Sequence, residues 1–265
     1  MIINKPHMKK ILTLLIASAA AVAAAAQSLP LSESSASDVQ GRFRAGLTVP
    51  IGRSVSIGWS EQLRLCDNFG SVEKVVSSLG VNYKPIPFLK LGAEYCLVND
   101  RDPVDGWDIR HRVNFDVTGL YRAGRVKLSL RERVRMRFRS DSVNRYEKPD
   151  PLVTLRSRFK VAYDIRRSHW EPYVYAELYV TLNAPAPVGN FKTDAFSHDN
   201  YINRVRLAFG TEYKIDRRNR LDFYYMVHFN REYRARYKAG SGAMKEWSLV
   251  KRCNHVFGVD YNFKL

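Results

Sequence analysis

A fifteen-residue stretch with a strict two-residue alternation constrains the fold of this chain more than any other feature. Residues 125–139 read RVKLSLRERVRMRFR; one parity holds seven cations in eight positions, and the other is apolar except for Glu132. A period of two indicates a β-strand with one apolar and one cationic face. The stretch far exceeds the roughly 5–6 residues of an ordinary strand. A long strand of this kind is typical of a transmembrane β-barrel wall, apolar outside and polar inside.

The N-terminus has the three parts of a secretory signal peptide. Lys5, Lys9 and Lys10 form a basic region, residues 11–26 are apolar, and Ala24-Ala25-Ala26 is a small-residue cleavage site. A transmembrane helix is the alternative, but 16 residues that are mostly alanine are short for one. We therefore expect cleavage of residues 1–26 and export of the remaining chain.

Export decides how the charge of the chain is interpreted. Without the three signal lysines, the net charge falls from +17 to +14. Such a balance often indicates nucleic acid or a membrane surface as partner, but export argues against nucleic acid. Cys66, Cys96 and Cys253 have no metal-binding spacing, so we expect no metal and no cofactor. The sequence leaves open whether Cys66 and Cys96 form a disulfide, which export permits.

From residue 40 onward the chain falls into alternating segments, so we expect an all-β, antiparallel up-and-down transmembrane barrel over residues 40–265. The segments run roughly over 40–49, 54–66, 72–84, 88–98, 109–122, 125–139, 152–164, 170–182, 201–214, 219–231 and 253–265. Short connections at 50–53, 85–87, 123–124, 165–169 and 215–218 alternate with long ones at 67–71, 99–108, 140–151, 183–200 and 232–252. Outer-membrane barrels have this alternation, with the short turns on the periplasmic side.

The segments that enter the short turns share a tyrosine on their apolar parity. A ring of tyrosines at one level is typical of a membrane interface, with rings in lipid and hydroxyls among headgroups. We therefore predict a periplasmic aromatic girdle of Tyr83, Tyr121, Tyr163, Tyr213 and Tyr261. The final segment alternates up to Leu265, an ending that barrel-insertion machinery reads.

Several segments resemble a known family. Residues 110–138 resemble the central hairpin of the "domain of unknown function 2490" outer-membrane proteins of Bacteroides-type bacteria, and residues 61–69, 78–95 and 257–265 resemble their flanking hairpins and closing strand. The resemblance implies an outer-membrane β-barrel with no established activity. It brings no catalytic residues.

The number of strands is a difficulty. The chain has eleven alternating segments, whereas bacterial single-chain barrels have even numbers. Residues 27–39 would then form a twelfth strand or thread the lumen. We expect twelve strands, with ten as the alternative.

Two carboxylates also break the pattern, because Glu61 and Glu132 fall on the apolar parity. A carboxylate that faces lipid is unfavourable. A β-bulge would turn such a side chain inward. Alternatively, Glu132 would pair with Arg131 or Arg133.

With the polar parity directed inward, the lumen becomes strongly cationic. Its predicted cationic face is Arg110, Arg112, Arg125, Lys127, Arg131, Arg133, Arg135, Arg137, Arg156, Arg158, Lys160, Arg204 and Arg206. Clustered guanidinium groups bind phosphate, sulfate or carboxylate. We expect an outer-membrane barrel of a Gram-negative bacterium with a narrow or side-chain-filled lumen; the alternative is an anion-selective porin or a barrel that binds anionic ligands. The expected partners are outer-membrane lipids, the insertion machinery and small anions.

Two further classes of function are alternatives to a binding or conducting barrel. A lipid hydrolase would need a Ser–His dyad on the outer wall, for which His255 and Ser248 are the candidates. No G-x-S-x-G surrounds Ser248, so we expect no catalytic residues and no enzyme. A partner-binding role through aromatic residues of the long loops is the third class.

Overall fold

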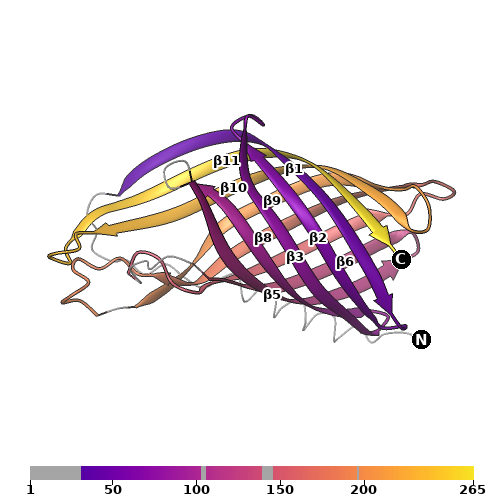
Figure 1. Ribbon diagram of the computed structural model, residues 1–265, viewed down its shortest axis with the longest axis horizontal. Helices are drawn as coiled ribbons and strands as arrows, with labels where there is room; N and C mark the ends of the chain where they lie inside the picture. The colour runs from indigo at the N-terminus through magenta and orange to yellow at the C-terminus, as the bar shows by residue number, and fades with distance from the viewer. Residues whose placement is uncertain (1–30, 103–105, 139–145, 196) are drawn as a thin grey trace.

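The chain forms a closed β-barrel. Its computed structural model describes residues 31–102, 106–138, 146–195 and 197–265. Within these residues there are eleven strands: β1 (Ser32–Ile51), β2 (Val55–Cys66), β3 (Ser71–Ile86), β4 (Leu89–Asp102), β5 (Gly106–Ala123), β6 (Val126–Arg137), β7 (Leu152–Tyr163), β8 (Trp170–Pro185), β9 (His198–Lys214), β10 (Asn219–Tyr237) and β11 (Met244–Lys264). Figure 1 shows these long strands tilted across the barrel. The prediction of an all-β barrel is confirmed.

The first and last strands close the barrel in parallel. β1 pairs with β11 from Ser32 opposite Ser248 to Thr48 opposite Lys264, whereas consecutive strands pair antiparallel. The predicted twelve strands, and the alternative of ten, are wrong. Residues 32–39 extend β1 instead of forming a separate strand or threading the lumen. A closed barrel needs an even number of strands only when all neighbouring strands are antiparallel. The parallel pairing of β1 with β11 therefore permits an odd number. The predicted signal peptide lies outside the described residues.

The connections differ between the two ends of the barrel. At one end, residues 52–54, 87–88, 124–125, 164–169 and 215–218 join the strands, as the sequence predicted. At the other end, much of the predicted loop sequence is strand: β4 and β5 stay paired up to Asp102 opposite Gly106, and β10 and β11 up to Tyr237 opposite Met244. The predicted long loops at 99–108 and 232–252 are therefore largely extended hairpins.

One short turn shows how side chains stabilise these connections. The Asp216 carboxylate accepts hydrogen bonds from the backbone N–H groups of Arg218 and Asn219, at 2.6 and 2.8 Å, and from the Asn219 side-chain amide at 2.7 Å. Hydrogen bonds to a carboxylate favour its charged form, so they lower the pKa of Asp216.

The two faces of the sheet differ in polarity, with apolar side chains on the outside of the barrel and polar side chains on the inside, the reverse of a water-soluble protein. Large apolar side chains point away from the barrel and are exposed, such as Trp59 at 50% and Phe209 at 59%. Polar side chains are buried inside, such as Glu177 at 2% and Arg206 at 5%. Charged residues are almost never fully buried in proteins unless they are paired, so the interior depends on a polar network. In the described part of the chain, no helix is long and apolar enough to span a membrane.

The five predicted girdle tyrosines all lie near the short connections. Four of them, Tyr83, Tyr121, Tyr163 and Tyr261, are exposed. Tyr213 is half-buried because it packs against Trp170, with ring centroids 4.5 Å apart. Their interfacial role stays a prediction.

Glu61 and Glu132 remain on the apolar parity, each beside a serine on the next strand. Glu61 lies opposite Ser77 and accepts its hydroxyl hydrogen bond at 2.7 Å; Glu132 lies opposite Ser157 and accepts at 2.6 Å. No register shift turns Glu132 inward within the described pairs of β6, and its bonded partner is Ser157 and not an arginine. The three cysteines, Cys66, Cys96 and Cys253, all have free thiols.

Candidate functional site: an arginine-lined chamber

The barrel encloses a cavity of about 460 Å³, which we call the chamber. Among the described residues, thirteen basic and four acidic side chains line it. Nine of the basic residues belong to the predicted cationic face: Arg112, Arg131, Arg133, Arg135, Arg156, Arg158, Lys160, Arg204 and Arg206. Four were not in that prediction: Arg42, Arg44, Arg64 and Lys90. The acidic residues are Glu94, Asp116, Asp222 and Asp260.

The other four predicted cations do not line the chamber. Arg110 is bound to Asp108 at 2.8 Å and to Asp100 at 3.3 Å. Lys127 is bound to Glu171 at 2.6 Å, near the short turns. Arg125 is exposed in the turn before β6, and Arg137 is half-buried at the far end of β6. The predicted cationic face is therefore divided between the chamber and the two ends of the barrel.

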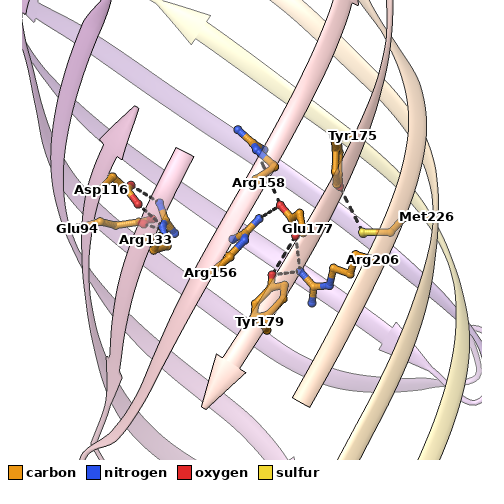
Figure 2. Close-up of polar contacts among 10 residues, drawn as sticks. All are labelled: Glu94, Asp116, Arg133, Arg156, Arg158, Tyr175, Glu177, Tyr179, Arg206 and Met226. Atoms are coloured by element: carbon orange, nitrogen blue, oxygen red, sulfur yellow. Dashed lines mark hydrogen bonds and ion pairs between the residues drawn. The ribbon is translucent and has the colours of Figure 1, made fainter. Parts of the chain in front are cut away.

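Glu177 is the centre of one buried network in the wall of the barrel. Its side chain is fully buried and forms ion pairs with Arg156, with Arg206 at 3.4 Å and with Arg158 at 3.9 Å. The Tyr179 hydroxyl donates to the same carboxylate at 3.0 Å and accepts a hydrogen bond from Arg206. Figure 2 shows these arginines converging on Glu177 of β8 from its two neighbouring strands, Arg156 and Arg158 from β7 and Arg206 from β9. A buried carboxylate is stable when paired in this way.

Arg133 is the centre of a second network, also drawn in Figure 2. Its guanidinium contacts Asp116 through two nitrogens, each at 2.5 Å, and Glu94 at 3.0 Å. Two parallel hydrogen bonds between a guanidinium and a carboxylate are the strongest and most directional form of this contact. These two networks hold three of the inner-wall carboxylates.

The Tyr179 ring is surrounded by cations. The guanidinium carbons of Arg206, Arg204 and Arg135 lie 4.7, 5.3 and 5.9 Å from its centroid. Cation–π contacts of this kind stabilise arginines that lack a carboxylate partner. Arg204 depends on such contact, since it has no hydrogen bond or ion pair within the described structure.

A further group of chamber cations has no polar partner. In the described part of the chain, Arg42, Arg44, Arg112, Arg131 and Lys90 form neither a hydrogen bond nor an ion pair. Arg42 is only 6% exposed, and its Nε is buried and unsatisfied. Arg64 interacts electrostatically with Arg42, directly opposite on β1, and with Arg112 on β5 and Arg206 on β9, so like charges gather in the lumen.

Glycines give the chamber its room. Four neighbouring strands, β1 to β4, each place one glycine in its lining, namely Gly46, Gly58, Gly80 and Gly92. Gly58 lies directly opposite Gly80. A Cβ added at Gly58 would meet nothing closer than the Leu47 carbonyl oxygen at 3.7 Å, so this glycine borders open space. We call these four glycines the glycine wall; the same strands also carry lining cations, such as Arg42 and Arg64.

Residues 40–238 match the model of a family described as "Protein of unknown function (DUF2490)". The chain belongs to this family. The resemblance that the sequence indicated is therefore confirmed, and the match spans most of this DUF2490 barrel. No curated protein matches the chain.

Among solved structures, the barrel is similar to OmpT of Vibrio cholerae. The outer-membrane expressed form is 16% identical, with a TM-score of 0.38, over 80% of this chain and 62% of that one. The in-vitro folded trimer form, an outer membrane protein, is 15% identical, with a TM-score of 0.35, over 79% and 64%. The DUF2490 chain thus spans less than two thirds of the length of these proteins.

The hydrolase candidates do not come together. Ser248 lies within β11 and not in a loop, seven residues before His255 on the same strand. At about 3.3 Å per residue they are roughly 23 Å apart, and the odd spacing places them on opposite faces. His255 instead bonds the Tyr225 hydroxyl at 2.6 Å. Among the described residues, no three histidine, cysteine or acidic side chains group as metal ligands.

The chamber residues that the prediction missed had a weak signal in the sequence. Arg42 and Arg44 alternate with Phe43, and Arg64 alternates with Leu63 and Leu65, in the pattern of the dense arginine stretch. These segments hold only one or two cations each, whereas residues 125–139 hold seven, so the number of cations does not mark them.

Proposed function

We propose that this chain is an outer-membrane β-barrel whose lumen holds a binding site for small oxyanions. The observation that supports this proposal best is the set of chamber cations without partners, above all the buried Arg42. A buried charge without a counter-charge is unfavourable, so these side chains favour an anion among them.

The outer face supports the membrane location. Exposed apolar side chains on successive strands suit the hydrocarbon of a bilayer, where a closed barrel satisfies its backbone hydrogen bonds. The proposed setting is a Gram-negative outer membrane, reached through a cleaved signal peptide and the barrel-insertion machinery, with its lipids as partners. That the chain is not an enzyme stays a prediction.

The chemistry of the chamber suits oxyanions. Guanidinium is planar, stays charged and presents several N–H donors to phosphate, sulfate or carboxylate oxygens. Within the described lining, arginines greatly outnumber carboxylates, and two of the four carboxylates, Glu94 and Asp116, are already bound by Arg133. The remaining donors are available to a ligand.

Direct binding of inorganic phosphate tests this proposal. Isothermal titration of protein refolded in detergent should give saturable binding, and Arg42→Gln with Arg131→Gln should weaken it at least tenfold. Arg218→Gln, in an exposed turn, is the matched control and should bind like the wild type. No saturable binding by a folded wild type would overturn the proposal.

Passage of anions is the second candidate function. Basic residues follow the inner wall from Lys127 near the short turns to Arg110 near the opposite end. Rings of cationic side chains select anions in pores. Planar-bilayer recordings across a potassium chloride gradient separate the two candidates: an anion-selective reversal potential supports passage, and the absence of channel current leaves a binding barrel.

A further inference from the structure

A continuous row of carboxylates crosses four neighbouring strands inside the barrel. Glu171 on β8 lies opposite Glu212 on β9, Glu212 lies opposite Asp222 on β10, and Asp222 lies opposite Asp260 on β11. The first two have cationic partners: Glu171 binds Lys127 and Lys214, and Glu212 binds Arg220 at 3.2 Å.

Asp222 and Asp260 differ from the other two. Both line the chamber, and neither forms an ion pair within the described structure. Their partners are hydroxyls: Tyr173 donates to Asp222 at 2.7 Å, and Tyr224 donates to Asp260 at 3.5 Å. Like charges directly opposite one another destabilise a sheet, so this pair favours a cation from outside the protein.

The protein's own cations approach this pair without binding it. The Lys160 ammonium interacts electrostatically with Asp222, yet it lies over the Tyr173 ring, 3.5 Å from the centroid. Arg44, directly opposite on β1, and Arg42 act on Asp260 in the same way, and neither forms an ion pair with it within the described residues.

The chamber therefore has two poles. Unpartnered guanidiniums, including the buried Arg42 with its unsatisfied Nε, form the positive pole. Asp222 and Asp260 form the negative pole, which adjoins the positive one where Arg44 on β1 lies opposite Asp260 on β11. We infer that the chamber binds a small zwitterion, whose carboxylate or phosphate meets the arginines and whose ammonium group meets Asp222 and Asp260. Amino acids and short peptides belong to this class. The inference rests on the proposed anion site and adds the second pole to it.

A matched pair of ligands tests the inference. L-Glutamate and glutarate share two carboxylates and differ in the ammonium group. Titration of folded wild-type protein should show glutamate binding at least tenfold more tightly than glutarate. In the variant Asp222→Asn with Asp260→Asn, glutamate should fall to the level of glutarate, while binding of phosphate stays the same or improves. Glu212→Gln removes a carboxylate of the same row that already has a partner, so it should keep the wild-type preference.

The possible results distinguish failure of the zwitterion inference from failure of the proposed oxyanion site. If phosphate binds but glutarate equals glutamate in the wild type, the zwitterion inference is overturned and the anion site stands. If neither phosphate, glutarate nor glutamate binds, both are overturned. Calcium binding that is lost in the double variant and not displaced by glutamate would assign the acidic pair to a metal, against the inference. Heat-modifiable gel mobility verifies folding of each variant.

Discussion

Tyr224 on β10 packs its ring against the backbone of Gly258, directly opposite on β11. A Cβ at Gly258 would collide with three atoms of that ring. Gly258→Ala should therefore lower the free energy of unfolding by about 1–3 kcal/mol, the usual effect of overpacking. Urea unfolding from lipid vesicles, followed by tryptophan fluorescence, measures this.

Two variants make the Gly258 result specific. Gly58→Ala, whose added methyl group meets only ordinary contacts, should change the stability little. Combining Gly258→Ala with Tyr224→Ala should recover part of the loss. Equal effects of the two glycine substitutions would show that packing against Tyr224 is not the cause.

The buried charge of Glu177 should be essential to the inner wall. Glu177→Gln leaves Arg156 and Arg206 without a charged partner, and breaking a buried ion pair costs about 3–5 kcal/mol. The same unfolding measurement should show a loss of that order, or failure to refold. Glu246→Gln, which removes an exposed pair with Arg236, is the control and should cost less than about 1 kcal/mol. Similar losses in the two variants would contradict this account of the network.

The outward pair Glu132–Ser157 should be unfavourable in a bilayer. Replacing Glu132 by Leu and Ser157 by Val removes both polar groups from the apolar face, so the barrel should gain roughly 1–3 kcal/mol in lipid vesicles. Glu94→Leu is the inward control, and it should destabilise because Arg133 loses a partner. A less stable outward double variant would mean that the outer face is not in contact with lipid.

The architecture follows closely from the two-residue period. The alternation of Val126 to Arg137 predicts which side chains face inward and places Arg131, Arg133 and Arg135 in the chamber; the same alternation in β5, β7 and β9 places six more predicted cations there. Short turns are also visible because few residues separate the alternating segments. The closure of the barrel cannot be predicted from this alternation, because the pairing of β1 with β11 depends on contacts between residues more than two hundred positions apart.

The site itself was predictable only in part. The arginines are evident in the sequence, but their partners are not: Glu177 is one of many inward carboxylates until the fold brings Arg156 and Arg206 to it. The glycine wall was missed because four single glycines on four strands give no local signal. The free space in a lumen depends on which small residues lie next to one another. The register between neighbouring strands determines this.

Filling the chamber without changing its charge is a further test. Gly58→Leu places a side chain in the open space that this glycine of the wall borders, and it removes none of the arginines. Phosphate binding should fall at least tenfold, with unchanged heat-modifiable mobility. Gly240→Ala lies in the connection between β10 and β11, outside the chamber lining and with open space for a Cβ, and it should leave phosphate binding unchanged. Undiminished binding in Gly58→Leu would place the anion elsewhere.

Locating a bound oxyanion tests the central claim most directly. Crystals of the refolded barrel grown with selenate allow the anion to be found by the anomalous scattering of selenium. We predict a peak inside the chamber within hydrogen-bonding distance of Arg42 or Arg131, and its loss when both are replaced by Gln. Selenate peaks only on the outside of the barrel, with an anion-free chamber, would contradict the account.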